Sequence, residues 1–363
     1  MLLVVTSVII VIIILVVMTV MDMTGERRFV RAFAAGLKKF PPRVESLNRE
    51  YGRLELSESR LAALMAAPDM SEAIAVLGSV RNHRMIPDKI LWANHLSQKC
   101  VPAPTPYLTT HEYPPTDLVN SILETGLDRF AMKPSHLGGK SQVVLYDHGK
   151  DVLGTRPMSR AELVTEACDM FKIEPRRPGI SPGIIVESLV PCEFEIRCLV
   201  VWGRVVAGWV FRRIQFDGFG KTLGHGVLAR SGEWSANPFV LEFAAPWPSA
   251  GSFKKFADSE WKIAVDLVEA LAEGVDYATI DLMFAPGQRW VGNIDPYRVP
   301  YDFQQYVQDA ALGLLKSGYR ARGLAELSEA DAIHRVNEQP EPDGQAEIAV
   351  GHVVADHDDV AAD

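Results

Sequence analysis

The sequence is poor in the features that mark disulfide-rich, zinc-binding and nucleic-acid-binding proteins. It contains only 4 cysteines, and these (Cys100, Cys168, Cys192 and Cys198) form no CxxC pair. A disulfide framework or a structural zinc site needs closely spaced cysteines, so we expect reduced thiols in a cytosolic setting. Basic residues are also outnumbered, with 37 Lys and Arg against 46 Asp and Glu. This balance argues against a general nucleic-acid binder.

The acidity is concentrated at the C-terminal end of the chain. Residues 324–363 carry eleven Asp and Glu but only one basic residue, Arg335, so the formal net charge of −9 lies there and the rest is near neutral. With Pro340 and Pro342, this stretch has the composition of a disordered segment. We therefore expect residues 323–363 to form an acidic, disordered tail, either simply solvated or docking a basic partner.

One long apolar run stands at the N-terminus. All but three of the residues from 2 to 21 are apolar. A helix of this length measures about 30 Å, the thickness of the hydrocarbon core of a bilayer. The run therefore predicts a transmembrane anchor over residues 1–22. Two alternatives stay open: a cleaved signal peptide, although a cationic start and a cleavage site are lacking, and a true start at Met18, Met21 or Met23.

The residues that follow the apolar run are basic. Between positions 22 and 43, six basic residues face two acidic ones (Arg27, Arg28, Arg31, Lys38, Lys39 and Arg43 against Asp22 and Glu26). The cytoplasmic flanks of membrane helices are enriched in Lys and Arg. We therefore expect a single-pass membrane protein, with the remainder of the chain facing the cytoplasm.

The remainder of the chain mixes helices and strands. Apolar spacing predicts helices over residues 57–77, with a break near Pro68, and over 87–96, 254–272 and 303–315. Strands are predicted over 130–133, 142–146, 183–189, 194–201, 205–211, 277–284 and 290–294. The pattern predicts an α+β fold with antiparallel hairpins in the C-terminal half, preceded by a basic helical connector over residues 23–85.

A glycine-containing loop follows the strand that ends at Lys133. The next eight residues read PSHLGGKS and look like a P-loop, but a proline stands where the first glycine is required. The loop still carries Gly138, Gly139, Lys140 and Ser141, whose backbone N–H groups and lysine suit phosphate oxygens. An ordinary Gly-Gly turn between two strands explains the same residues equally well.

Three hard ligands lie on the last predicted hairpin. Asp281, Asn293 and Asp295 stand on its two strands, so their side chains can converge. Carboxylate and amide oxygens suit Mg²⁺ shared with nucleotide phosphates. Asp281 interrupts an apolar strand, where a carboxylate is costly unless it is paired or bound to a metal. The alternative is that Asp281 caps a turn or pairs with an arginine.

A second polar group lies on the hairpin before it. Glu195 and Arg197 share one face of the predicted strand over residues 194–201, by the period of two. Arg212 and Arg213 end the partner strand. Arginine clusters bind phosphoryl groups and carboxylates through paired N–H donors. A solvent-facing charge ladder with Glu195 is the other interpretation.

Taken in order, five segments resemble the ATP-grasp superfamily of ATP-dependent ligases. They are Asp88-Lys89 at a helix start, FAMKPSHLGGKSQVVLYD, GIIVESLV, EFEIRCLVVWGRVVAGWVFRR and VDYATIDLMFAPGQRWVGNIDP. The EIRCLVVWGRVVAGWVFRR stretch is similar to RimK-type glutamate ligases, and FAMKPSHLGG is similar to TupA-like enzymes of teichuronopeptide synthesis. The resemblance covers roughly residues 86–300. It implies an ATP-grasp fold of two α+β subdomains that clasp ATP, here over residues 86–178 and 179–322.

The resemblance also implies roles for individual residues. Lys89 and Lys133 would contact the nucleotide phosphates under the loop of Gly138, Gly139, Lys140 and Ser141. Glu187, Ser188 and Leu189 would form the adenine hinge, with Glu193 or Glu195 near the ribose. Arg197 and Arg213 would stabilise the transferred phosphoryl group, while Asp281, Asn293 and Asp295 would hold Mg²⁺. The family has Glu-x-Asn where this chain has Asn293-x-Asp295, so the carboxylate count is kept and the order is swapped.

A chain that follows this family joins a carboxylate to an amine. ATP phosphorylates the carboxylate, and the amine then displaces phosphate from the acyl-phosphate to form an amide. The resemblance therefore implies a ligase that uses ATP and Mg²⁺ and joins small-molecule or glycan-linked substrates. Together with the predicted anchor, it implies that one of these substrates is a cell-envelope or exopolysaccharide precursor. Two other interpretations stay open: a phosphotransferase of the same fold, and a non-catalytic, membrane-tethered nucleotide-binding protein. Nucleic acid is not an expected partner.

Overall fold

The chain divides into two compact units. The computed structural model describes residues 27–37, 57–77, 88–136, 143–152, 156–173, 180–190, 192, 194–216, 219–232, 234–236, 260–285, 287–296, 299–300, 303 and 305–337, without the side chains of 211–216, 219–226, 234–236 and 323–337. The first unit, Met1–Gly323, holds two six-stranded sheets. The second unit, Leu324–Asp363, contains the last turns of one long helix.

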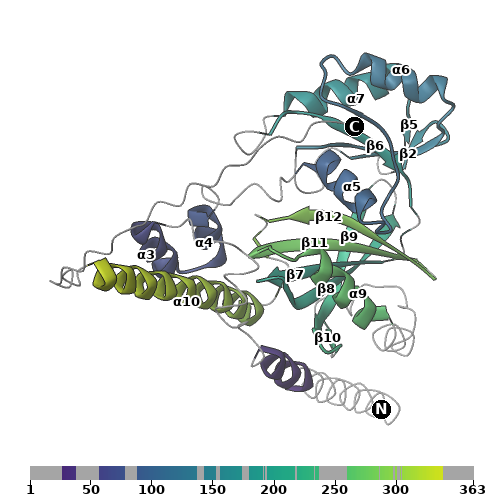
Figure 1. Cartoon of the computed structure of the whole chain (residues 1–363). Helices are drawn as coiled ribbons and strands as arrows, with labels where there is room; N and C mark the ends of the chain where they lie inside the picture. The colour runs from purple at the N-terminus through teal and green to yellow at the C-terminus, as the bar shows by residue number, and fades with distance from the viewer. Residues whose placement is uncertain are drawn as a thin grey trace, which may run out of the picture. The chain divides into compact units, whose positions relative to one another are not determined.

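The first sheet is antiparallel and is covered by helices on one face. Its order is β1 (Pro106–Thr110), β6 (Ile184–Ser188), β2 (Arg129–Pro134), β3 (Val144–Asp147), β4 (Lys150–Asp151) and β5 (Arg156–Pro157). Phe130 and Met132 of β2 are buried with residues of α6 (Thr116–Glu124) and α7 (Arg160–Lys172), the two helices beside this sheet in Figure 1. Successive side chains of a strand point to opposite faces. Ala131 and Lys133 therefore lie on the other face, where the candidate site begins.

The second sheet is also antiparallel. Its order is β10 (Trp234–Ala236), β9 (Phe219–Ala229), β8 (Arg204–Phe216), β7 (Phe194–Val201), β11 (Tyr277–Ala285) and β12 (Gln288–Asp295). Helix α9 (Lys262–Leu271) covers one face, where Val265 and Val268 are buried with Cys198. Trp261, just before α9, donates from Nε1 to the carbonyl oxygen of Ala229 at 2.9 Å.

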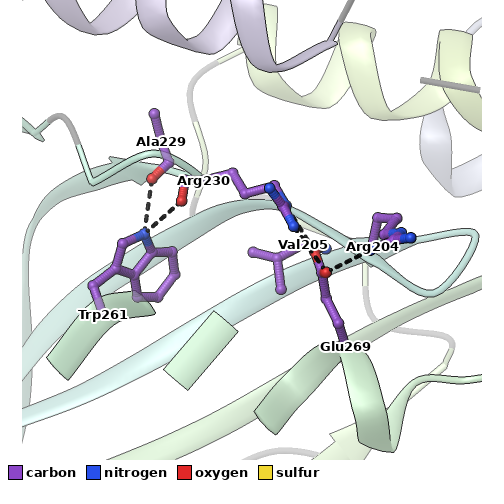
Figure 2. A network of polar contacts seen from close by, with 6 residues as sticks. All are labelled: Arg204, Val205, Ala229, Arg230, Trp261 and Glu269. Atoms are coloured by element: carbon purple, nitrogen blue, oxygen red, sulfur yellow. Dashed lines mark hydrogen bonds and ion pairs between the residues drawn. The ribbon is translucent and has the colours of Figure 1, made fainter. Parts of the chain in front are cut away.

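One carboxylate fastens α9 to the sheet (Figure 2). Glu269 accepts hydrogen bonds from Arg230 (Nε to Oε1 at 2.7 Å, Nη2 to Oε2 at 2.9 Å), from Arg204 Nη1 at 2.9 Å and from the Val205 N–H at 3.1 Å. Burial by itself raises the pKa of Glu269, but the hydrogen bonds from the two arginines outweigh it and hold that pKa below its ordinary value. Glu269 is therefore ionised at neutral pH and ties α9 to the β7–β8 turn and the end of β9.

The other face of the second sheet changes character along a single strand. In β7, Leu199 and Val201 are buried in an apolar cluster, whereas Glu195 and Arg197 on the same face line a cavity. The apolar cluster also takes in residues of α10 (Gln305–Asn337), α3 (Glu58–Ala66), α4 (Met70–Leu77) and the helix over residues 27–37. Among the described residues, helices cover this face at the Leu199 end of β7, and the cavity lies at the Glu195 end.

Several elements follow the sequence pattern closely. The strand predicted over residues 194–201 coincides with β7, and both predicted hairpins of the second sheet are present. The helix predicted over 57–77 is broken between α3 and α4, next to Pro68. The predicted α+β class with antiparallel hairpins is confirmed.

Two boundaries differ from those drawn on the sequence. Helix α10 continues to Asn337, so residues 323–337 of the predicted disordered tail are helical. Residues 316–337 are rich in Ala, Leu, Glu and Arg, which favour helix, and contain no proline. Strand β6 pairs with β2 in the first sheet, although the predicted boundary at residue 179 assigns it to the second subdomain. Strand pairing rather than chain order decides which sheet a strand joins.

The predicted membrane anchor, residues 1–22, and the tail beyond residue 337 both lie outside the described residues. Within the part of the chain that is described, no helix combines the length and apolar character needed to cross a bilayer. The predicted connector over residues 23–85 contributes to the core of the first unit, because Phe29, Leu64 and Leu77 are fully buried.

Candidate functional site

Residues from both sheets line one cavity in the first unit. The cavity measures about 880 Å³, including space that is open to solvent. Its polar lining consists of Lys89, Lys133, Glu187, Ser188, Glu195, Arg197, Asp281 and Asn293. Ala131, Val143, Leu145, Leu189, Val190, Met283 and Gly292 complete the lining. A concave lining that mixes apolar and charged side chains is typical of small-molecule sites.

Lys89 enters the cavity from the first turn of α5 (Lys89–Gln98). The helix start is fixed by Asp88, whose carboxylate accepts a hydrogen bond from the Ile90 N–H at 2.7 Å. The Lys89 side chain is 8% exposed, and its ammonium donates to the Pro134 carbonyl at 2.6 Å. Burial and the nearby charge of Lys133 lower the pKa of Lys89 to about 7. An anion beside this group would favour its charged form, so the position suits a phosphate.

Lys133 is paired with a carboxylate on the neighbouring strand. Its Nζ lies 2.5 Å from Glu187 Oε1, and both side chains are largely buried. The register places Ala131 directly opposite Glu187, so Lys133 is the next residue along the same face of β2. An ammonium group has three donors. Lys133 can therefore contact a phosphate oxygen while it keeps Glu187.

Arg197 and Asp281 form an ion pair across β7 and β11. The two residues are register partners, and Arg197 Nε donates to Asp281 Oδ1 at 2.8 Å. Arg197 is 5% exposed, so its guanidinium is held in a largely dry environment. The structure shows the pairing with an arginine that the sequence allowed for Asp281, and its predicted role as a Mg²⁺ ligand stays a prediction.

A β-bulge in β12 brings Asn293 to the cavity. The register with β11 shifts between Ile280 and Leu282, so Gly292 and Asn293 together lie opposite Asp281. Gly292 packs tightly there, because a Cβ would lie 3.2 Å from the Asp281 carbonyl oxygen. The bulge turns Asn293 toward the same cavity as Asp281.

The apolar part of the lining lies next to the charged part, on residues two positions away along the same strands. Ala131 precedes Lys133 by two residues on β2, and Met283 follows Asp281 by two residues on β11. Glu195, opposite Met283 on β7, is 4% exposed and adds a carboxylate beside this part. The cavity therefore offers an apolar surface for a ring and, next to it, cations for phosphates.

Nine of the residues singled out on the sequence meet in this cavity. They are Lys89, Lys133, Glu187, Ser188, Leu189, Glu195, Arg197, Asp281 and Asn293. Asp295 does not line it, although its charge acts on Lys89. Gly138, Gly139, Lys140, Ser141 and Glu193 lie outside the described residues, and Arg213 is described on β8 only by its backbone. The roles assigned to all of these residues stay predictions.

The donor set near Asp281 fits a magnesium ion that is shared with a ligand. Asp281 supplies a carboxylate and Asn293 an amide oxygen, and Mg²⁺ commonly binds through one or two protein oxygens together with phosphates and water. Within the described ranges, no group of three or more His, Cys, Asp or Glu is placed to hold a metal. The residues therefore fit a phosphate-bound ion and not a cage built by the protein alone.

Two residues that support the site were not predicted from the sequence. Ser135 and His136 follow Lys133 and join β2 to its surroundings: Lys89 N–H donates to Ser135 O at 3.0 Å, and Gly183 N–H donates to His136 Nδ1 at 3.2 Å. His136 Nε2 lies 3.0 Å from the Ile173 carbonyl, which requires a proton on Nε2. Burial lowers the pKa of His136, so the neutral ring keeps both bonds. A histidine after a buried strand was the only signal in the sequence.

Comparison with solved structures finds ligases. The chain is similar to D-alanine–D-alanine ligase from Bacillus anthracis, with a TM-score of 0.40 and 18% identity, over 70% of this chain and 71% of that chain. It is also similar to the ATP-grasp ligase PsnB bound to a minimal precursor (0.36, 12%, 70% and 68%) and to VanG D-Ala:D-Ser ligase from Enterococcus faecalis (0.38, 16%, 69% and 63%). No protein-family model and no curated protein matches the sequence. With TM-scores below 0.5, the function rests on the chain's own residues.

Proposed function

We propose that the cavity binds ATP and that the protein is an ATP-dependent carboxylate–amine ligase. The observation that carries the proposal is the pair of lysines, Lys89 buried and Lys133 half-buried, beside an apolar wall in one cavity. Burial lowers the pKa of Lys89 to about 7, and a bound polyanion would stabilise the charged forms of both lysines. An apolar wall one strand step away accommodates a nucleobase.

The remaining polar residues suit phosphoryl transfer. Arg197 can share its guanidinium between Asp281 and a phosphoryl oxygen, because it carries five N–H donors. Asp281 and Asn293 are the residues that would hold Mg²⁺, with Asp295 nearby, and the ion would neutralise phosphate charge. Arg213 is assigned to the same phosphoryl group by the sequence resemblance alone. The protein's contribution is alignment and charge stabilisation.

The proposed reaction has two steps. A substrate carboxylate oxygen attacks the γ-phosphorus of ATP, which forms an acyl-phosphate and releases ADP. A substrate amine then attacks the acyl carbon, which forms an amide and releases inorganic phosphate and a proton. The ordered motifs that resemble RimK-type and TupA-like ligases support this chemistry over simple phosphate transfer.

We place the substrates at a membrane. The apolar run over residues 2–21 and the basic residues after it favour a single-pass anchor with the cavity on the cytoplasmic side. An enzyme held there meets lipid- or glycan-linked intermediates of the cell envelope or of exopolysaccharide. One such precursor would supply the carboxylate or the amine.

Trapping with hydroxylamine tests the chemistry. Full-length protein is incubated with ATP, Mg²⁺, hydroxylamine and a panel of amino acids and uronic acids, and hydroxamate and ADP are measured. A ligase yields hydroxamate, since hydroxylamine captures the acyl-phosphate. Asp281→Asn is expected to lower the yield by at least about a hundredfold, whereas Asp309→Asn, at an exposed position on α10, is the matched control.

Two outcomes would replace the proposal. A phosphate ester without hydroxamate would identify a phosphotransferase. Tight ATP binding without ADP release across the panel would identify a non-catalytic nucleotide-binding protein, for which Asp281→Asn leaves function in cells unchanged.

A further inference from the structure

We propose that the outer face of the helix over residues 27–37 binds the surface of an anionic lipid bilayer. This inference rests on the proposed membrane attachment and is independent of the ligase chemistry. The helix reads RRFVRAFAAGL and contains three arginines and no acidic residue.

The inner face of this helix is built into the core of the first unit. Phe29 is 0% exposed and Phe33 is 6% exposed. Their rings stack on each other at 5.7 Å and meet the ring of Tyr306 on α10 edge-on, at 6.2 and 5.9 Å. Both belong to the buried cluster that contains Leu199 of the second sheet. Two large aromatic side chains therefore fix which side of the helix faces outward.

The outer face is basic. Arg27, Arg28 and Arg31 are all exposed, and Val30 between them is 42% exposed. Ala34 and Ala35 extend the same exposed side without bulk or charge. We call these three arginines the arginine face. A short helix with cationic side chains around a small apolar centre is suited to lie on a headgroup layer.

A lipid surface is favoured over other anionic partners by what precedes the helix. The apolar run ends at Met21, and five residues, 22–26, separate it from Arg27. Five extended residues span at most about 18 Å, so an inserted run would keep the arginine face next to the headgroups. Each basic side chain near an anionic bilayer strengthens binding by about fivefold, and three by roughly a hundredfold.

The arrangement has a mechanical consequence for the site. Phe29 and Phe33 pack in the same buried cluster as Leu199 and Val201 of β7. The helix that carries the arginine face is therefore packed against the strand that carries Glu195 and Arg197. A bilayer bound to this helix would therefore hold the second sheet and its part of the cavity wall at the membrane surface.

Vesicle competition tests the proposal. Full-length protein is transferred from detergent to a mixture of phosphatidylcholine vesicles and denser vesicles of equal parts phosphatidylcholine and phosphatidylglycerol, which are then separated and assayed for protein. The wild type is expected to prefer the anionic vesicles by roughly a hundredfold at low salt and far less at high salt. The Arg27→Gln, Arg28→Gln, Arg31→Gln variant is expected to lose most of this preference.

A matched variant removes the same charge elsewhere. Arg60→Gln, Lys99→Gln, Lys150→Gln changes three exposed positions outside the helix and should keep the wild-type preference. Equal thermal unfolding midpoints show that both variants are folded. A wild type without preference, a retained preference in the arginine-face variant, or an equal loss in the matched variant would each overturn the proposal. Hydroxamate formation in detergent, measured on the same samples, reports on the ligase chemistry separately.

Discussion

At the scale of single residues, the pKa of Lys89 is shifted strongly by its surroundings. Burial and the charge of Lys133 lower its pKa from 10.5 to about 7. Between these two values the unfolded chain keeps a proton that the folded chain has released. Stability rises with pH wherever the unfolded state binds more protons. The stability of the protein therefore rises as pH rises from about 7 to about 10. Below pH 7 Lys89 is charged in the folded protein, and the full free-energy cost of burying that charge lowers stability.

Replacing Lys89 by methionine removes this linkage. Compared with Lys89→Met, the wild type is expected to gain stability steadily between pH 7 and 10, and to be the less stable of the two at pH 6. Urea unfolding of both proteins at several pH values measures the difference. Lys150→Met, at an exposed position of β4, should show the wild-type pH dependence. A flat difference between wild type and Lys89→Met would show that Lys89 keeps an ordinary pKa.

At the scale of elements, α10 is docked on the turn between β7 and β8 through a glycine. Trp202 in that turn is 1% exposed, and its Nε1 donates to the Leu314 carbonyl of α10 at 3.1 Å. A Cβ at Gly318, one helical turn further on, would lie 2.2 Å from the indole nitrogen. The helix can approach the sheet this closely only because residue 318 lacks a side chain.

Gly318→Ala is therefore expected to destabilise the protein by about 1–3 kcal/mol, since the indole has to move or the helix has to separate from the turn. Gly313→Ala on the same helix is the control, because a Cβ there meets nothing within 4 Å. Alanine in a helix interior is favoured over glycine by about 1 kcal/mol, so this variant should be more stable than the wild type. Thermal unfolding of both variants gives the comparison. A stable Gly318→Ala protein would contradict the docking.

The strands that form the site show how much of it the sequence could predict. Arg197 and Asp281 each interrupt an apolar strand, so both could be recognised as functional candidates. Their ion pair depends on the register between β7 and β11, which pairs residues 84 positions apart, and no local pattern encodes that register. The bulge that turns Asn293 inward is equally invisible. Helix α7 was open to prediction, because Ser159 and Glu162 form a capping box at its start.

At the scale of the whole molecule, both sheets share one cavity, so a ligand there stabilises them together. A ligand that binds only the folded chain stabilises it by about 2.7 kcal/mol at a concentration one hundred times its Kd. A non-hydrolysable ATP analogue with Mg²⁺ is therefore expected to raise the unfolding midpoint of the wild type by several degrees. Differential scanning fluorimetry with increasing analogue measures this shift.

Lys133→Met should reduce the shift strongly, because it removes a cation at the proposed phosphate position and leaves Glu187 as an unpaired carboxylate. The double variant Lys133→Met, Glu187→Gln removes that second effect and should respond as weakly as the single variant. Lys150→Met, which lies outside the cavity lining, should respond like the wild type. An undiminished shift in Lys133→Met would place the nucleotide elsewhere.

The contact between Phe29, Phe33 and Tyr306 joins the beginning of the described chain to its last helix. A ribosome adds about 5–20 residues per second, so the two phenylalanines leave it roughly 15 to 60 s before their tyrosine partner. During that interval the packing partners of the N-terminal helix have not all been synthesised, so Phe29 and Phe33 remain exposed to water unless something else covers them. If residues 2–21 are already in a membrane at that stage, the neighbouring bilayer surface can cover them until synthesis ends. Because the N-terminal segment is synthesised first, the membrane would then assist its folding as well as hold the finished protein.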